Sequence, residues 1–198
     1  TSRGPPMAPL NFDPPEHTRF RRILHPFFSP STLATLLPSL QSQAAEIIDG
    51  IAQRDECEVM ADLATPYPSQ VFLTLFGLPL GDRDELIRWT DAIIELSLAD
   101  DPAAVDLTPA AELFGYLTKA VEEHRHNPSD DVLSRVLVGD DPLTDAEAVG
   151  LSFVFVLAGL DTVKSTIGAT MLELARRPAL RAELHEKPDL VPVFVEEM

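Results

Sequence analysis

The chain has 198 residues, 45% of them hydrophobic, and a formal net charge of −17. It can hold one ordinary globular core, and the negative charge excludes broad nucleic-acid binding, which needs a basic surface. Its single cysteine excludes a framework of internal disulfides, and the longest apolar run, 149–160, is shorter than the ~20 residues that span a bilayer, so we expect a cytoplasmic protein with no membrane segment.

The first part of the chain has the pattern of successive helices. "FDPPEHTRFRRILHPFF" carries the signals of a helix start with Asp13 as N-cap, and Pro26 should end that helix. A second helix is predicted over 29–53. "CEVMADLA" is expected to hold a short strand, and "PSQVFLTLFGLP" a buried helix closed by Gly77.

The second part continues in the same class. Helices are expected over 82–98, 108–126, 129–137, 178–187 and 189–198. Between them lies a long helix that begins with a capping box of Thr144 and Glu147 and ends before Pro178. The fold class is therefore mainly α, with little β. "TSRGPPMAPLNF" reads as a loop in mid-course and "PVFVEEM" stops within a helix, so we expect 1–198 to be one partial domain, truncated at both ends.

The long helix contains "FVFVLAGLDTVKS", which is apolar on every side yet carries an acid beside a hydroxyl. A charged carboxylate in such surroundings is costly unless something satisfies it. Asp161 has possible structural partners in Lys164 and Ser165, one turn on. Thr162 can bond back to the carbonyl of Ala158 and is expected to loosen the helix there. Beside such a distortion, Asp161 and Thr162 could instead deliver protons. Spacing alone leaves both interpretations open.

One face of the same helix carries a stripe of small side chains. They are Ala158, Gly159, Thr162, Ser165, Thr166 and Ala169. Such a stripe permits either the close approach of a neighbouring helix or contact with something flat.

The first helix combines an apolar face with basic residues. Its buried face is predicted to consist of Phe20, Ile23, Leu24 and Phe27. His17 and Arg21 lie side by side at the border, where they offer donors to an anion, although Arg21 could also pair with one of the 32 acidic residues. Arg19 and Arg22 are expected to face solvent, as a docking patch for an acidic partner or as an ordinary solvated surface.

These residues carry a resemblance to a known family. "DPPEHTRFRR" followed by "FFSP", then "AGLDTV", then "EE" near the end resembles a bacterial cytochrome P450, a soluble haem-thiolate monooxygenase. The resemblance covers essentially the whole chain and implies its central part, from the family's helix C through the long helix I to the start of helix K. The complete enzyme would insert one oxygen atom from O2 into a hydrophobic small molecule, with haem b as cofactor and a ferredoxin-type electron donor.

The resemblance also assigns roles by position. The residues implied to contact haem are His17, Arg21, Ala158, Gly159 and Thr162. Asp161 and Thr162 match the acid–alcohol pair that delivers protons during oxygen activation. The remaining implied sites are a substrate pocket at Val154 and Leu157, an electron-donor patch at Arg19 and Arg22, the Glu-x-x-Arg motif residue Glu197, and lid helices around 82–98 and 108–126.

The chain departs from the family pattern in one respect that matters for activity. The arginine partner of Glu197 and the cysteine loop that ligates iron would come after Met198, so the resemblance implies no metal ligand here and no monooxygenase activity for this chain alone. Cys57 is not that ligand, because the adjacent carboxylates of "DECEV" disfavour a thiolate.

Two other functional classes stay open at this point. A non-catalytic helical binding module would treat Asp161 as a satisfied core charge. An all-α terpenoid cyclase would use the "DDP" pairs at 100 and 140 to hold magnesium. Pro142 and the Thr144 cap place the second pair in a loop, which disfavours the cyclase.

Overall fold

The computed structural model describes residues 7–99, 101 and 106–198, and this part of the chain is helical without a strand. The helices are α1 (Glu16–Leu24), α2 (Pro30–Ala52), α3 (Pro66–Leu75), α4 (Arg83–Leu98), α5 (Thr108–His126), α6 (Val132–Val138), α7 (Asp145–Arg176), α8 (Pro178–Glu186) and α9 (Val191–Glu196). Short helical turns lie at η1 (His25–Phe28), η2 (Met60–Ala64), η3 (Leu80–Asp82) and η5 (Pro188–Leu190). The mainly α class is confirmed.

Two local predictions are wrong, one about the start of a helix and one about the type of an element. Helix α1 begins at Glu16 with Pro15 as its N-cap, and Asp13 contributes only its backbone carbonyl, which accepts from the amide of His17 at 3.1 Å. The predicted strand in "CEVMADLA" is the π-helical turn η2. There the carboxylate of Asp62 accepts from the amide of Glu58 at 2.8 Å, a local bond that competes with an extended backbone.

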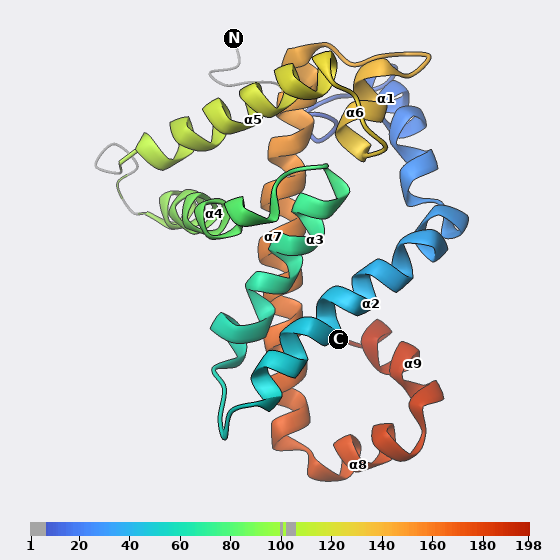
Figure 1. Ribbon diagram of the computed structural model, residues 1–198, viewed down its shortest axis with the longest axis vertical. Helices are drawn as coiled ribbons and strands as arrows, with labels where there is room; N and C mark the ends of the chain where they lie inside the picture. The colour runs from blue at the N-terminus through green and yellow to red at the C-terminus, as the bar shows by residue number, and fades with distance from the viewer. Residues whose placement is uncertain (1–6, 100, 102–105) are drawn as a thin grey trace.

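Helix α7 forms the axis of the molecule (Figure 1). It begins with the predicted capping box, in which the Glu147 amide donates to Thr144 Oγ1 at 3.3 Å and the Thr144 amide donates to Glu147 Oε2 at 2.8 Å. Helices α3, α4, α5 and α6 pack around it. Its fully buried residues all lie between Ala148 and Leu160, so the half that is apolar all round is the half that is enclosed.

Within the described residues, α7 is also the one helix whose length and composition would suit a membrane span. Its most apolar window of 18 residues has a mean hydropathy of 1.7 and is 39% buried inside the molecule. This window is longer than the apolar run 149–160 named above. Since the core helix of a globular protein can have the same length and mean hydropathy, these two properties alone are weak evidence for a membrane segment.

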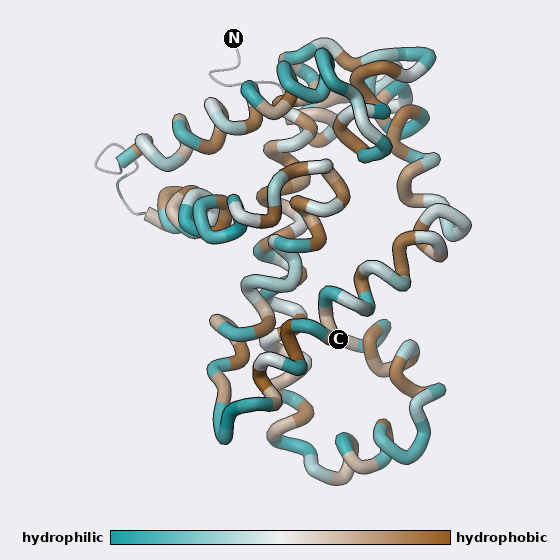
Figure 2. The backbone as a smooth tube through the Cα atoms, in the orientation of Figure 1, coloured by the Kyte–Doolittle hydropathy of each residue, from teal (hydrophilic) through white to brown (hydrophobic). Residues whose placement is uncertain are grey.

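The core gathers around the upper half of α7, where helices from distant parts of the chain meet. Phe20 of α1, Leu113 of α5 and Leu133 of α6 are almost fully buried there. Aromatic rings add to the packing, since Phe114 stacks on Phe153 with ring centroids 4.4 Å apart. Hydrophobic stretches also occur on α9, to the right of the lower half of α7 (Figure 2), where valine side chains are exposed.

Gly77, which follows α3, should be intolerant of any side chain. Its φ is 67°, in the left-handed region, and an added Cβ would lie 2.6 Å from the carboxylate of Asp131, the N-cap of α6. We expect Gly77→Ala to lower the free energy of unfolding by about 1–3 kcal/mol, measured by urea denaturation. Gly81→Ala is the control, because a Cβ there meets no atom within 4 Å. Equal effects of the two substitutions would contradict the prediction.

Candidate functional site

Two basic side chains lie one turn apart along α1 and have no partner among the residues that the structure describes. His17 is half-buried and Arg21 is exposed, and neither makes a side-chain hydrogen bond or ion pair with any residue that the structure describes. The structural alternative for Arg21, pairing with an acidic residue, is therefore not realised in this part of the chain. Both side chains keep donors that can bind an anion.

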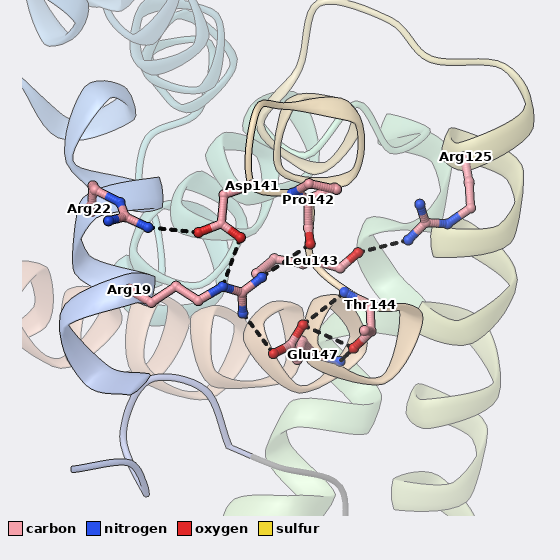
Figure 3. Close-up of polar contacts among 8 residues, drawn as sticks. All are labelled: Arg19, Arg22, Arg125, Asp141, Pro142, Leu143, Thr144 and Glu147. Atoms are coloured by element: carbon pink, nitrogen blue, oxygen red, sulfur yellow. Dashed lines mark hydrogen bonds and ion pairs between the residues drawn. The ribbon is translucent and has the colours of Figure 1, made fainter. Parts of the chain in front are cut away.

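Arg19 is not the solvent-facing cation that the sequence predicts (Figure 3). Its guanidinium donates to Asp141 Oδ1 at 2.9 Å, to Glu147 Oε1 at 2.8 Å and to the carbonyl of Pro142 at 3.1 Å. The side chain is 28% exposed, whereas that of Arg22 is 72% exposed. Even Arg22 donates to Asp141 Oδ2, at 2.8 Å. The expected orientation is wrong for Arg19, because the loop before α7 covers that side of α1 and neutralises it.

A second arginine binds the same loop from α5 (Figure 3). Arg125 donates to Asp145 Oδ1 at 2.6 Å and to the carbonyl groups of Leu137 at 3.2 Å and Leu143 at 2.8 Å. This contact was not predicted from the sequence, because no local spacing indicates it. Carboxylates of "DDPLTD" that a cyclase would use for magnesium thus bind arginines, while the other "DDP" pair lies partly outside the described residues.

Asp161 has a structural partner. Lys164 Nζ lies 3.2 Å from Asp161 Oδ1 and 3.0 Å from Asp91 Oδ1 on α4. Burial opposes the charge of Lys164, but the hydrogen bonds to Asp91 and Asp161 prevail and raise its pKa. The lysine therefore stays charged and balances the carboxylate. Spacing identified Lys164 as a possible partner, whereas Asp91, which lies far away in the sequence, was missed.

The hydroxyl beside this acid is held by the helix itself. Thr162 Oγ1 donates to the carbonyl of Ala158 at 2.5 Å, as predicted. The loosening of the helix predicted with this bond is wrong, because α7 continues as one α-helix to Arg176. Thr162 is exposed, so its hydroxyl oxygen can still accept a hydrogen bond. Thr166 repeats the arrangement one turn later and donates to the carbonyl of Thr162 at 2.9 Å.

The small-residue face of α7 is open in the described part of the structure. Its exposed members are Ala158, Thr162, Ser165, Thr166 and Ala169. A Cβ added to Gly159 would meet no atom within 4 Å. Helix contact therefore does not account for the small side chains among the described residues. Gly159 also borders an apolar pocket of about 170 Å³, into which α3 contributes Tyr67 and Val71.

The remaining candidate residues lie on α7, at the end of α9 and in the segment before η2. Val154 and Leu157 are half-buried on the turns of α7 that precede Ala158. Glu197 is exposed at the end of α9 and forms no ion pair with the described residues. Cys57 is a free, exposed thiol. Their predicted roles stay predictions.

Residues 6–191 match the family model "Cytochrome P450". The chain belongs to the cytochrome P450 family. Cytochrome P450 CYP107DY1 of Priestia megaterium is 30% identical over 192 residues, which cover 96% of this chain and 47% of that relative. Vitamin D(3) 25-hydroxylase of Pseudonocardia autotrophica is 33% identical, with 97% of this chain and 47% of the relative covered. The chain therefore spans about half the length of these P450 relatives.

Solved P450 structures have the same fold over this half. Myxobacterial CYP267B1, solved in complex with myristic acid, superposes with a TM-score of 0.84 and 35% identity, covering 93% of this chain and 47% of that structure. P450BioI, in complex with an acyl carrier protein that carries hexadec-9Z-enoic acid, gives a TM-score of 0.85 and 26% identity, covering 94% and 49%. These similarities confirm the predicted P450 fold fragment.

Proposed function

We propose that this chain is the central part of a haem-thiolate monooxygenase that inserts one oxygen atom from O2 into a hydrophobic small molecule. The observation that carries the proposal is the open small-residue face of α7 beside Asp161 and Thr162. A flat ring fits against such a face. The donors of His17 and Arg21, which have no partner in the described part of the chain, suit the carboxylates of haem propionates. The residues present thus fit the cofactor that the family implies.

Haem b, once bound, would supply the oxygen activation, with electrons from a ferredoxin-type donor. His17 and Arg21 would hold its propionates, and Ala158, Gly159 and Thr162 would lie against the porphyrin. Val154 and Leu157 would present apolar surface to the substrate. The hydrophobic nature of that substrate is supported by the names of similar proteins, which include a vitamin D(3) hydroxylase and a P450 solved with myristic acid.

In the proposed reaction, Asp161 and Thr162 move protons. Asp161 is partly exposed and can take a proton from solvent, while Thr162 Oγ1 lies on the open face of the same helix. The carboxylate would pass its proton to the hydroxyl oxygen, and the hydroxyl would donate toward the reacting centre. Lys164 Nζ, which lies 3.2 Å from Asp161 Oδ1, would hold the carboxyl group in position.

The surrounding elements have supporting roles in this proposal. Helices α4 and α5 pack together and against α7, and would form the lid over the substrate. Arg22 stays available to an electron donor, whereas Arg19 does not. The complete protein would work in the cytoplasm without nucleic acid or membrane. The chain alone would be inactive, because Cys57 lies exposed in an acidic loop and cannot serve as the thiolate ligand.

The test is the absorption spectrum of the complete protein, reduced and exposed to carbon monoxide. We expect a strongly red-shifted Soret band, the signature of thiolate-ligated haem. A folded protein without any haem band would overturn the proposal. His17, Arg21 and the α7 face would then serve packing, and the chain would be a helical binding module.

A further inference from the structure

We infer that Arg19 is a positioning residue that fixes the orientation of α1, and with it the propionate donors His17 and Arg21, relative to α7. The inference rests on the proposed haem contacts and goes beyond them, because Arg19 touches neither the cofactor nor the substrate in this account. It assigns a role to a residue that the sequence placed on the solvent side.

Arg19 and the two donors lie on opposite sides of α1. At about 100° per residue, positions two apart on a helix are separated by about 160° around its axis. His17 and Arg21 are each two residues from Arg19. The loop before α7 therefore binds the side of α1 that carries Arg19, while His17 and Arg21 lie on the opposite side. Because the helix rotates as a rigid body, fixing the Arg19 side also fixes the direction of the two donors.

The bonds of Arg19 end on groups that are themselves held in place (Figure 3). Its partner Glu147 belongs to the capping box, where one carboxylate oxygen accepts from the amide and the hydroxyl of Thr144 at 2.8 and 3.0 Å. Arg125 binds the carbonyl of Leu143 on the far side of the loop. A guanidinium fork bonded to two carboxylates and a carbonyl leaves α1 little freedom to rotate.

These polar contacts are needed because the buried contacts of α1 are apolar. Its backbone lies close mainly to the adjoining turn η1, and the buried side chains of Phe20 and Leu24 are apolar, hence without directional bonds. Apolar contacts tolerate a small rotation, whereas hydrogen bonds do not. A rotation of about 20° moves a group 5–6 Å from the helix axis by about 2 Å, which breaks a bond with a range of 2.7–3.2 Å.

The hydrogen bonds from Arg19, followed by those from Arg22, also lower the pKa of Asp141. The carboxylate therefore stays charged throughout the neutral range, and the link between α1 and the loop persists there.

The experiment compares Arg19→Gln with Arg22→Gln in the complete haem-loaded protein. The measured quantity is the rate of haem loss to excess apomyoglobin, which requires no turnover. We expect Arg19→Gln to raise this rate about tenfold and Arg22→Gln to change it less than twofold, because Arg22 is highly exposed and its side chain bonds only Asp141 among the described residues. Equal rates for the parent and Arg19→Gln would overturn the inference.

A second cofactor separates positioning from simple support of the fold. Haem with its propionates esterified as dimethyl esters offers no carboxylate to His17 and Arg21. If Arg19 positions those donors, the difference between the parent and Arg19→Gln should shrink below twofold with this haem. An unchanged tenfold difference would mean that Arg19 merely supports the fold, and would refute the inference.

Glu147→Gln tests the same contact from the partner's side, in case the Arg19 variant does not fold. Glutamine can still complete the capping box, so this substitution weakens one bond to Arg19 and spares the start of α7. We expect haem loss to rise about threefold, again only with unesterified haem. No rise would count against the inference. A parent protein that binds no haem would instead show that the proposed function fails, and the inference with it.

Discussion

Thr162→Ala in the complete enzyme should uncouple oxygen activation from product formation. Reductant should still be consumed and hydrogen peroxide released, while product per reductant falls about a hundredfold, at the lower end of what a positioned proton donor contributes. The Thr162 hydroxyl is the polar group that α7 presents on its open face next to Asp161. Alanine removes that group and leaves the size of the face almost unchanged. The measurement is the ratio of product and peroxide to reductant consumed.

Thr166→Ala is the matched control for this substitution. Thr166 lies one turn further along α7, is also exposed, and makes the same bond to a carbonyl one turn back. Its loss should change coupling less than twofold. Thr162→Ser, which keeps a hydroxyl, should stay close to the parent. Full coupling in Thr162→Ala would remove Thr162 from the proton path.

Features that depend on neighbours in the sequence could be predicted. The capping box of Thr144 and Glu147 is such a feature, because both partners lie in one turn and the bonds are the same in any helix. The enclosed half of α7 follows from its apolar circumference in the same way. The predicted start of α1 is wrong by two residues, because the N-cap is Pro15 and not Asp13, and residue preferences for caps do not fix a helix end more closely than that.

Contacts between distant segments could not be predicted. A helical wheel correctly placed Arg19 away from the apolar face of α1, but it says nothing about which segment covers that side. The loop that does so lies far along the chain and brings Asp141 and Glu147 with it. Asp91 reaches Lys164 for the same kind of reason, through the packing of α4 on α7.

The candidate site was predictable to the extent that its chemistry lies on single helices. His17 and Arg21 share α1, and Ala158 and Thr162 share α7, so spacing alone grouped each pair correctly. Whether a grouped side chain is free or engaged depends on tertiary packing. Arg21 is free of protein partners among the described residues, whereas Arg19, two positions away, is fully engaged.

Asp161→Asn should slow product formation by about a hundredfold, at the lower end of what general acid–base groups contribute. The ion pair with Lys164 satisfies the carboxylate, as the structural interpretation of Asp161 predicts. This ion pair contributes too little to stability to explain why an acid occupies the position. With side chains 36% and 21% exposed, a pair of this kind contributes only about 0–1 kcal/mol to stability.

The two interpretations predict different results for the two partners. If the pair is purely structural, Asp161→Asn and Lys164→Met should lower the free energy of unfolding by similar small amounts and leave turnover almost intact. If Asp161 delivers protons, Asp161→Asn should lose turnover and Lys164→Met should lose only a few-fold, because the acid remains. Asp91→Asn, which removes the other partner of Lys164, is the control and should resemble Lys164→Met. Turnover rates and urea denaturation of the three variants distinguish the two roles. Both roles predict the same small loss of stability when Asp161 is replaced, but only a proton-carrying carboxylate predicts a large loss of turnover.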